Sequence, residues 1–324
     1  MKAKLYKQSW PIRGSFTISR GSKTQAETII VEIEHQGATG RGECVPYGRY
    51  GESIDNVIEQ IEQVLPQVKS GISRDELQPL LPSGAARNAV DCAMWDLECK
   101  LSSKSVWQKV SLEADSLVTA YTLSLDTPEN MEKTAEENAF RPLLKLKLGG
   151  PDDLERVKAV RRGAPNSKII LDANEAWTAE IYQQLIPELL KLEVAMIEQP
   201  FHADDDQVLD SLERPIAICA DESCHDRNSL KNVIGRYDMV NIKLDKTGGL
   251  TEALQLKAQA EAAGLRIMVG CMVSSSLSMA PAFVVAQGAE VVDLDGPLLL
   301  SKDIEHGFEF ENNSMLPFRK ELWG

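Results

Sequence analysis

The pattern of hydrophobic and polar positions in residues 1–115 predicts strands followed by helices. Around residues 29–34, Ile29, Val31 and Ile33 alternate with Ile30, Glu32 and Glu34, as expected for a strand, and glycines between 37 and 42 favour a turn. Helical periodicity follows over 53–68 and again after Pro82-Ser83-Gly84, where apolar residues recur every three or four positions. This part of the chain is therefore predicted to be an α+β unit with antiparallel strands.

A regular alternation of short apolar segments and amphipathic helical patterns begins near residue 116. Gly264 and Gly288 lie where helices are expected to end. The apolar segments are predicted strands at 117–125, 143–148, 168–172, 195–198, 216–221, 239–243, 266–271 and 291–295. Eight strands, each separated from the next by a helix, indicate a (β/α)₈-type barrel. A doubly wound open sheet is the alternative, but no G-x-G-x-x-G follows any strand.

The pattern after the eighth predicted strand differs from the pattern within the barrel. No comparable helix follows it, so we expect residues 301–324 to return to the N-terminal part. The predicted fold is an α/β protein: a (β/α)₇β TIM-like barrel at 116–300, covered by an α+β capping domain. That cap is formed by residues 1–115 and the C-terminal segment 301–324.

The charge of the chain narrows its partners. It carries 35 Lys and Arg against 49 Asp and Glu, a formal charge of −14, and 43% of its residues are hydrophobic. These values are typical of a globular protein. Nucleic acids and anionic membrane surfaces attract clustered basic residues, so neither is an expected partner.

The cysteines and histidines limit the compartment and the metal. The six cysteines form no C-x-x-C pair and the N-terminus has no apolar signal sequence, so we expect reduced thiols in the cytoplasm. Four histidines without H-E-x-x-H spacing argue against a histidine-ligated zinc, and favour a hard metal held by carboxylates. The uncharged stretch 267–289 contains serines, a proline and glycines, and is interpreted as a buried strand and helix.

Carboxylates lie at the ends of three successive predicted strands. Asp172, Glu198 and Asp221 each follow an apolar run. Active sites of such barrels are at the carboxyl ends of the strands, and three oxygen ligands suit Mg²⁺. Solvated strand-end acids are the alternative interpretation of each residue taken alone.

Two lysines on either side of these acids indicate the reaction type. Lys147 and Lys243 belong to the second and sixth strands, so they should lie across the barrel from each other. A charge packed against the surrounding helices would be costly, which favours an inward direction. One lysine could remove an α-proton from a metal-bound carboxylate substrate, and the other could return a proton to the opposite face of the enediolate. This requires a lysine pKa well below 10.4. A Schiff-base lysine without metal and an inert binding barrel are the alternatives from other classes.

The ordered motifs resemble those of a known family. They are K-x-K, D-x-N, E-Q-P, A-D-E-S, N-I-K-L-D-K-T-G-G and D-x-D, with Arg20-Gly21-Ser22 and Arg49-Tyr50-Gly51 in the cap. The chain resembles the enolase superfamily, in its muconate-lactonizing subgroup, and more narrowly the L-Ala-D/L-Glu dipeptide epimerases. The resemblance implies one Mg²⁺ per active site on Asp172, Glu198 and Asp221, and an acid/base pair of Lys147 and Lys243. It also implies that Lys145 holds the substrate carboxylate, with Asn174 and Asp245 beside the ligands.

The same resemblance implies how a dipeptide is recognised. Asp293 and Asp295 would receive its α-ammonium group, although they could instead form an acidic turn before Gly296-Pro297. Arg20 and Lys23 would bind a glutamate side chain, or could be exposed basic residues of a loop. Tyr50 would close the cap over the site. Cys271 and Met272 would line the pocket floor, or pack in the core.

We therefore expect a Mg²⁺-dependent dipeptide epimerase, an isomerase that performs a 1,1-proton transfer at the α-carbon of the C-terminal residue. L-Ala-D/L-Glu and murein peptide recycling are the expected substrate and role. Another dipeptide, an N-acylamino acid or an o-succinylbenzoate-type dehydration is the alternative within the superfamily. The expected partner is the small dipeptide, and the sequence is compatible with a homo-oligomer while leaving the oligomeric state open.

Overall fold

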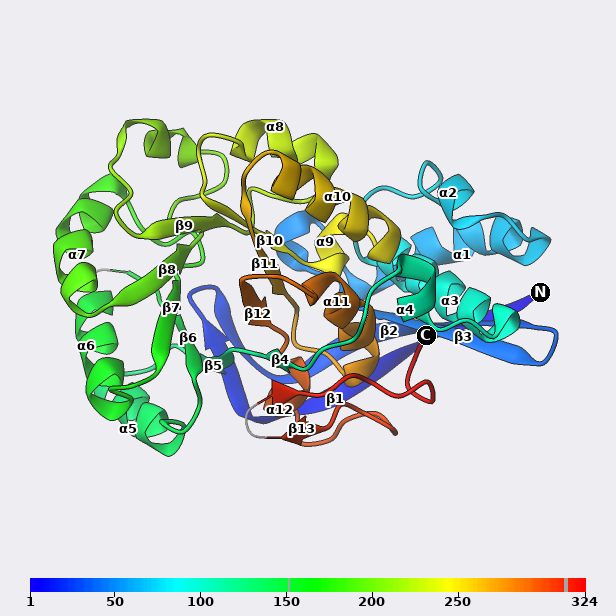
Figure 1. Cartoon of the computed structure of the whole chain (residues 1–324), viewed down its shortest axis with the longest axis horizontal. Helices are drawn as coiled ribbons and strands as arrows, with labels where there is room; N and C mark the ends of the chain where they lie inside the picture. Colours follow the sequence, from blue (N-terminus) through cyan, green and yellow to red (C-terminus); the bar gives the residue numbers. More distant parts are fainter. Residues whose placement is uncertain (151, 312–313) are drawn as a thin grey trace.

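The N-terminal part of the chain forms a three-stranded antiparallel sheet with helices packed against one face. The structure, a computed structural model, describes residues 1–150, 152–311 and 314–324 (Figure 1). The sheet has the order β1-β2-β3. The elements of this cap are β1 (Lys2–Ile18), β2 (Gly21–His35), β3 (Ala38–Cys44), η1 (Gly48–Tyr50), α1 (Ile54–Ser70), α2 (Arg74–Leu77), α3 (Ala85–Ser102) and α4 (Val106–Val110).

Two glycines let β3 lie directly on α3. A Cβ atom at Gly40 would come within 2.1 Å of the Ala93 carbonyl oxygen, and one at Gly42 within 2.1 Å of the Ala89 carbonyl oxygen. The glycines of 37–42 were expected to favour a turn, but only Gly37, with φ 82°, lies in one. The other two belong to β3 and allow close strand–helix packing.

The predicted helix starts are marked by side-chain caps. Ser53 is the N-cap of α1: its hydroxyl accepts the Asn56 N–H, and the Asn56 side chain accepts the Ser53 N–H. Such reciprocal caps satisfy amide groups that the first helical turn leaves without partners. The second predicted helix begins directly after Gly84, as α3.

The second part of the chain forms a nearly closed barrel of eight parallel strands (Figure 1). The Ala120 N–H donates to the Val292 carbonyl at 2.8 Å, which joins the first and last strands. The first expected strand, 117–125, divides into β4 (Leu117–Val118), which lies outside the barrel, and β5. The barrel strands are β5 (Tyr121–Leu123), β6 (Leu143–Lys147), β7 (Lys168–Asp172), β8 (Val194–Glu198), β9 (Ala217–Ala220), β10 (Met239–Ile242), β11 (Arg266–Gly270) and β12 (Val291–Asp293).

The connections between strands are less regular than the sequence pattern predicted. Well-formed α-helices follow five of the strands: α5 (Pro128–Glu137), α6 (Asp153–Gly163), α7 (Ala179–Lys191), α10 (Leu250–Ala262), preceded by α9 (Leu244–Thr247), and α11 (Ser276–Ala286). Only η2 (Asp206–Ser211) separates β8 from β9, and η3 (Arg227–Ser229) with α8 (Leu230–Val233) separates β9 from β10. The expectation of an α-helix between every pair of strands is therefore wrong between β8 and β9, and between β9 and β10 it is met only by the four-residue α8.

The uncharged stretch 267–289 forms β11 and α11, and every residue of α11 is buried. This confirms a buried strand and helix. None of the helices in the described part of the chain has both the length and the hydropathy to cross a membrane.

The C-terminal segment passes from the barrel back to the cap. After α12 (Gly296–Leu299), β13 (Phe310–Glu311) pairs with β14 (Ser314–Met315), which in turn pairs with β4. The Trp323 indole N–H donates to the Arg41 and Cys92 carbonyls at 3.0 and 3.2 Å, and this side chain is fully buried. The cap therefore includes the chain's last residues, while the boundaries at 115/116 and 300/301 stay predictions.

Candidate functional site

The carboxyl ends of the barrel strands carry a buried cluster of acids and lysines. β6 ends at Lys147, β7 at Asp172 and β8 at Glu198, while Asp221 and Lys243 directly follow β9 and β10. Because the strands are parallel, these ends meet at one mouth of the barrel. The clustered side chains are at most 7% exposed: Lys145, Lys147, Asp172, Glu198, Asp221, Lys243, Lys246, Asp293 and Asp295.

The two lysines expected to act as acid and base contact different carboxylates. Lys147 Nζ lies 2.5 Å from Oδ2 of Asp172, and Lys243 Nζ lies 2.6 Å from Oδ2 of Asp221. Their strands, β6 and β10, are four positions apart in the eight-stranded order. The lysines therefore approach the carboxylate cluster from opposite sides of the barrel.

Lys145 occupies the middle of the cluster. Its ammonium lies 2.6 Å from Glu198, 2.7 Å from Asp293 and 3.3 Å from Asp172. Burial by itself lowers its pKa, but the surrounding carboxylates outweigh this and hold the pKa well above the ordinary value. It can thus tie the acids of three strands together as a cation.

The mechanism led us to expect a lysine with a lowered pKa, but the neighbouring protein groups raise the pKa of Lys243, so this expectation is wrong for Lys243. Burial lowers its pKa, but Asp221 and Glu198 raise it by more, so the net shift is upward. For Asp221 the balance is the reverse. Burial by itself raises its pKa, but Lys243 and Lys246 lower the pKa by more, so that it lies well below its usual range. Burial followed by repulsion from Asp172 raises the pKa of Glu198.

The donor set fits a hard divalent cation. Among the residues that the structure describes, no three His, Cys, Asp or Glu side chains are already grouped as metal ligands. The three expected carboxylates instead face lysines. Glu198 Oε2 is buried and accepts no hydrogen bond, although Lys145 lies 2.6 Å away. Three buried carboxylates are the oxygen donors that Mg²⁺ prefers, provided that the lysines move off them.

Lys246 and Asn241 also belong to the cluster; both stand in the N-I-K-L-D-K-T-G-G motif, but neither was expected to be a site residue. Lys246 Nζ donates to Oδ1 and to the carbonyl of Asp221, both at 2.6 Å, and Asn241 Nδ2 donates to Glu198 Oε1 at 2.7 Å. The period of two on a strand could have indicated Asn241, which lies two residues before Lys243. Only its place in that motif could have indicated Lys246, because it reaches the cluster from α9 and not from a strand.

The two residues expected beside the metal ligands differ in direction. The Asn174 N–H donates to Oδ1 of Asp172 at 3.0 Å, as a neighbour of the ligands should. Asp245 instead faces the cap, where it accepts the Val45 N–H at 3.0 Å and Asn88 Nδ2 at 2.8 Å. Burial raises its pKa to about 7. Asp245 therefore joins the cap to the barrel, and neither of these two hydrogen bonds involves a proposed metal ligand.

The D-x-D pair at the eighth strand lies next to Lys145. Asp293 Oδ2 pairs with that lysine, whereas its Oδ1 is buried and has no hydrogen-bond partner among the described residues. Asp295 Oδ2 accepts the Thr122 N–H at 2.6 Å, and burial, reinforced by Asp293, raises the pKa of Asp295 to about 7. Burial, and then both acids, raise the pKa of the Cys271 thiol, which is itself partly exposed. Its neighbour Met272 is partly buried.

The cap supplies two of its three expected residues to the barrel mouth. Arg20 donates to Glu222 at 2.8 Å and to the Asn174 carbonyl at 3.0 Å. The Tyr50 ring packs edge-on against His225, with centroids 4.5 Å apart. Lys23 is exposed on β2 and makes no ion pair among the described residues.

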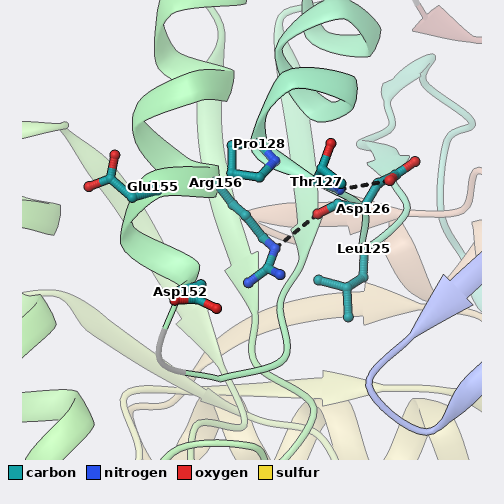
Figure 2. Close-up of a pocket in the computed structure, with 7 residues that line it drawn as sticks. All are labelled: Leu125, Asp126, Thr127, Pro128, Asp152, Glu155 and Arg156. Atoms are coloured by element: carbon teal, nitrogen blue, oxygen red, sulfur yellow. Dashed lines mark hydrogen bonds between the residues drawn. The ribbon is translucent and has the colours of Figure 1, made fainter.

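Two hollows lie near the strand ends. The larger, of about 520 Å³, is between the starts of α5 and α6, where Arg156 donates to the Asp126 carbonyl (Figure 2). None of the expected site residues lines it. The smaller, of about 360 Å³, lies where cap meets barrel and is lined in part by Tyr50, Asp245 and Lys246.

Comparison with known proteins agrees with the fold and the strand-end residues. Residues 1–110 match the "Mandelate racemase / muconate lactonizing enzyme, N-terminal domain", and residues 126–317 match the "Enolase C-terminal domain-like" family. The L-Ala-D/L-Glu epimerase of Escherichia coli (strain K12) is 44% identical, over 96% of this chain and 98% of that protein. An N-acetyl-D-glutamate racemase of a Pseudoalteromonas species is 45% identical, over 91% and 95%.

Solved structures are similar over the same length. An enolase family member from Agrobacterium tumefaciens with homology to dipeptide epimerases is 50% identical and covers 99% of both chains, with a TM-score of 0.98. That structure contains bound sodium and L-Ala-L-Glu. With both halves matched and relatives aligned almost end to end, this chain belongs to the enolase superfamily, in the group of mandelate racemase and muconate lactonizing enzymes.

Proposed function

We propose that this protein is a Mg²⁺-dependent dipeptide epimerase that inverts the α-carbon of the C-terminal residue, with L-Ala-D/L-Glu as its substrate. One observation carries the proposal. Lys147 and Lys243 reach a single cluster of buried carboxylates from opposite sides of the barrel. Inversion at one carbon requires removal of a proton from one face and delivery to the other, and two opposed lysines provide both.

Three lysines of the cluster have separate roles in the proposed reaction. One of Lys147 and Lys243 accepts the α-proton, and the other, as an ammonium, donates a proton to the opposite face. Lys145 neutralises the substrate carboxylate, for which its central position and raised pKa suit it. Phe16, whose ring centre is 5.8 Å from Lys147 Nζ, covers that lysine from the cap and limits its contact with water.

A divalent cation would be held by Asp172, Glu198 and Asp221. It would supply positive charge beside the substrate carboxylate, which makes the α-proton more acidic. The lysines would be released from the carboxylates that now raise the pKa of Lys243. The Agrobacterium tumefaciens relative, which contains sodium and L-Ala-L-Glu, supports a cation and an anionic dipeptide in so similar a chain.

The residues around the D-x-D pair support a substrate with a free ammonium group. Asp293 Oδ1 is buried without a partner, and the raised pKa of Asp295 reflects two acids held close together. A substrate ammonium would satisfy the first and relieve the repulsion in the second. Arg20 would bind the glutamate side chain, which requires it to exchange a carboxylate of the protein for that of the substrate.

Racemisation of N-acetylglutamate is the second candidate. It is supported by the pairing of Asp293 with Lys145, which already neutralises part of the ammonium site, and by the 45% identical Pseudoalteromonas racemase. An acetyl group has no positive charge and would leave the free oxygen of Asp293 unpaired. The dipeptide is therefore preferred.

Incubation with L-Ala-L-Glu in D₂O and Mg²⁺ tests the proposal. Deuterium should appear at the glutamate α-carbon, L-Ala-D-Glu should accumulate, and EDTA should stop both. Exchange that persists in EDTA would disprove the role of the cation. N-acetyl-L-glutamate is the comparison substrate: a higher kcat/KM on it than on the dipeptide would favour the second candidate. Asp293→Asn should reduce kcat/KM on the dipeptide by about tenfold or more, and on N-acetylglutamate by less.

A role in recycling murein peptides in the cytoplasm follows from this substrate. The resemblance of the chain to the L-Ala-D/L-Glu dipeptide epimerases implies this role. The six free cysteines, five of them buried, support a reducing compartment. Growth on L-Ala-D-Glu that depends on this gene would support the role.

A further inference from the structure

The buried carboxylate of Glu175, which follows β7, joins two segments of the cap to the barrel. These segments, the β1–β2 turn and η1, are called the cap loops below. Arg49 donates to the two carboxylate oxygens of Glu175 through Nε and Nη2, each at 2.8 Å. Arg20 Nη1 lies 3.3 Å from Glu175 Oε2. The Glu175 side chain is only 5% exposed, and no step of the proposed reaction uses it.

The two arginines belong to different segments of the cap. Arg20 is in the turn between β1 and β2, and Arg49 is in η1. Figure 1 shows the β1–β2 hairpin, in dark blue, extending from the cap to the barrel strands. The turn also contacts the residue that precedes η1, because Arg20 Nη2 donates at 2.9 Å to the hydroxyl of Tyr47, the N-cap of η1. A single carboxylate thus holds two cap segments that are also linked to each other.

The Glu175 carboxylate is oriented by an unusual backbone conformation after β7. Asn174 and Glu175 have φ angles of 45° and 66°, in the left-handed region that residues other than glycine seldom adopt. The Glu175 N–H donates to the Gln199 carbonyl, and the Ala203 N–H donates back to Glu175 Oε1, both at 2.9 Å. The segment after β7 is thereby fixed to the segment after β8. A strained conformation held on both sides indicates a position under functional constraint.

We propose that Glu175 is a positioning residue that clamps the β1–β2 turn and η1 over the barrel mouth and so keeps the substrate site in its closed, binding-competent form. Burial alone would raise its pKa, but the bonds from Arg49 and the Ala203 N–H outweigh burial and lower it. The carboxylate is thus ionised at neutral pH and forms a charge-assisted, two-pronged pair. Its loss should leave the acid/base lysines in place and open the cap.

A second carboxylate in the barrel provides a matched control. Glu252 is 8% exposed, accepts the Arg227 N–H and Nε at 3.0 Å, and joins η3 to α10 without touching either cap loop. Glu175→Gln and Glu252→Gln therefore remove the same chemistry at two places. Only the first should affect the cap loops.

Amide hydrogen exchange of the full-length protein without substrate tests the clamp directly. In Glu175→Gln, exchange in peptides covering 18–22 and 47–51 should be about tenfold faster than in the parent, since a charged hydrogen-bonded pair is lost. In Glu252→Gln, exchange in both peptides should be unchanged. Equal exchange in the parent and in Glu175→Gln would overturn the proposal, as would an equal increase in the Glu252→Gln control.

Kinetics separate a clamp from a merely structural role, and this readout rests on the proposed function. If closed molecules become a minority, KM for L-Ala-L-Glu should rise by about tenfold while kcat changes by less than about threefold. A loss of kcat at constant KM would contradict the clamp. If the parent protein does not act on dipeptides at all, the proposed function fails, while the exchange measurement still decides on the clamp.

Variants of Arg49 provide the test from the cap side, should Glu175→Gln not fold. Arg49→Met should accelerate exchange in 47–51 and leave 18–22 less affected, because Arg20 keeps its own bonds to Glu175 and Glu222. Arg49→Lys, which keeps the charge but lacks the two-pronged geometry, should give an intermediate value. No change in 47–51 for either variant would overturn the proposal.

Discussion

Lys246 Nζ donates to Oδ1 of Asp221 at 2.6 Å, on the opposite oxygen from the one that Lys243 contacts. Asp221 therefore lies between two buried ammonium groups, one expected to take part in proton transfer and one not. Lys246 is anchored further by the Asp221 and Asn241 carbonyls at 2.6 and 2.9 Å. It holds Asp221 in place whichever partner occupies the other oxygen.

Lys246→Met should lower the free energy of unfolding by about 3 kcal/mol, because a buried carboxylate and two carbonyls lose their charged partner. Mg²⁺ should restore more stability to this variant than to the parent, since a cation would replace the missing charge on Asp221. Urea unfolding with and without Mg²⁺ measures both. Lys231→Met, an exposed lysine of α8, is the control and should change stability little. Equal effects of the two substitutions would show that Lys246 does not support Asp221.

Lys147→Ala and Lys243→Ala should each abolish epimerisation, with a loss of at least about 10³-fold. Their deuterium exchange should differ: each variant should exchange the α-proton of one stereoisomer of the dipeptide only, because the remaining lysine reaches one face. Mass spectrometry of L-Ala-L-Glu and L-Ala-D-Glu after incubation in D₂O measures this. Equal residual epimerisation in both variants would contradict the two-base mechanism.

Arg20→Ala should reduce kcat/KM for L-Ala-L-Glu by tenfold or more, and for L-Ala-L-Leu by much less, because only the first offers a side-chain carboxylate. The arginine is already paired with Glu222 and Glu175, so the gain on binding is an exchange of partners. Lys23→Ala removes an exposed cation close in sequence and should affect neither substrate. Parallel losses on the two dipeptides would remove Arg20 from the specificity site.

Asp245 should make the protein less stable as the pH rises from about 4 to 7. Burial raises its pKa from 3.8 to about 7, so in this range the folded state binds a proton that the unfolded state has released. The folded state binds more protons, and stability must fall with rising pH, by up to about 1.4 kcal/mol per pH unit. Asp245→Asn removes this dependence while its amide oxygen can still accept the Val45 N–H.

Unfolding free energies of the parent and Asp245→Asn, measured at intervals from pH 4 to 8, check the sign. The advantage of the variant should grow from pH 4 to 7 and then level off. Asp75→Asn, at an exposed position in α2, should give a flat difference. A flat difference for Asp245→Asn as well would show that its carboxyl is ionised normally in the folded protein.

The order of strands and the chemistry at their ends were contained in the sequence. Each barrel strand is a short apolar run, and the residue at its end is identified by where that run stops. Since parallel strands bring their carboxyl ends to one edge, the sequence alone predicts one site for Lys147, Asp172, Glu198, Asp221 and Lys243.

The tertiary structure decided the contacts that cross between elements. Lys246 reaches Asp221 from a short helix, Asp245 turns toward the cap, and the connections around β9 contain only short helices. The periodicity of the sequence does not encode the directions of these side chains. They depend on the length of the connection between a strand and the next helix, and on which neighbouring residue can form a hydrogen bond.

The carboxylate Glu175 shows this division most clearly. Its sequence neighbours Asp172 and Asn174 marked the strand end, but its partners Arg20 and Arg49 are 155 and 126 positions away along the chain. The sequence by itself determined the order of the barrel strands and the acids and lysines expected at their ends, because local patterns of period two and 3.6 mark where each strand stops. Only the folded chain decided what closes over them, because ion pairs form between atoms that are near in space and need not be near in sequence.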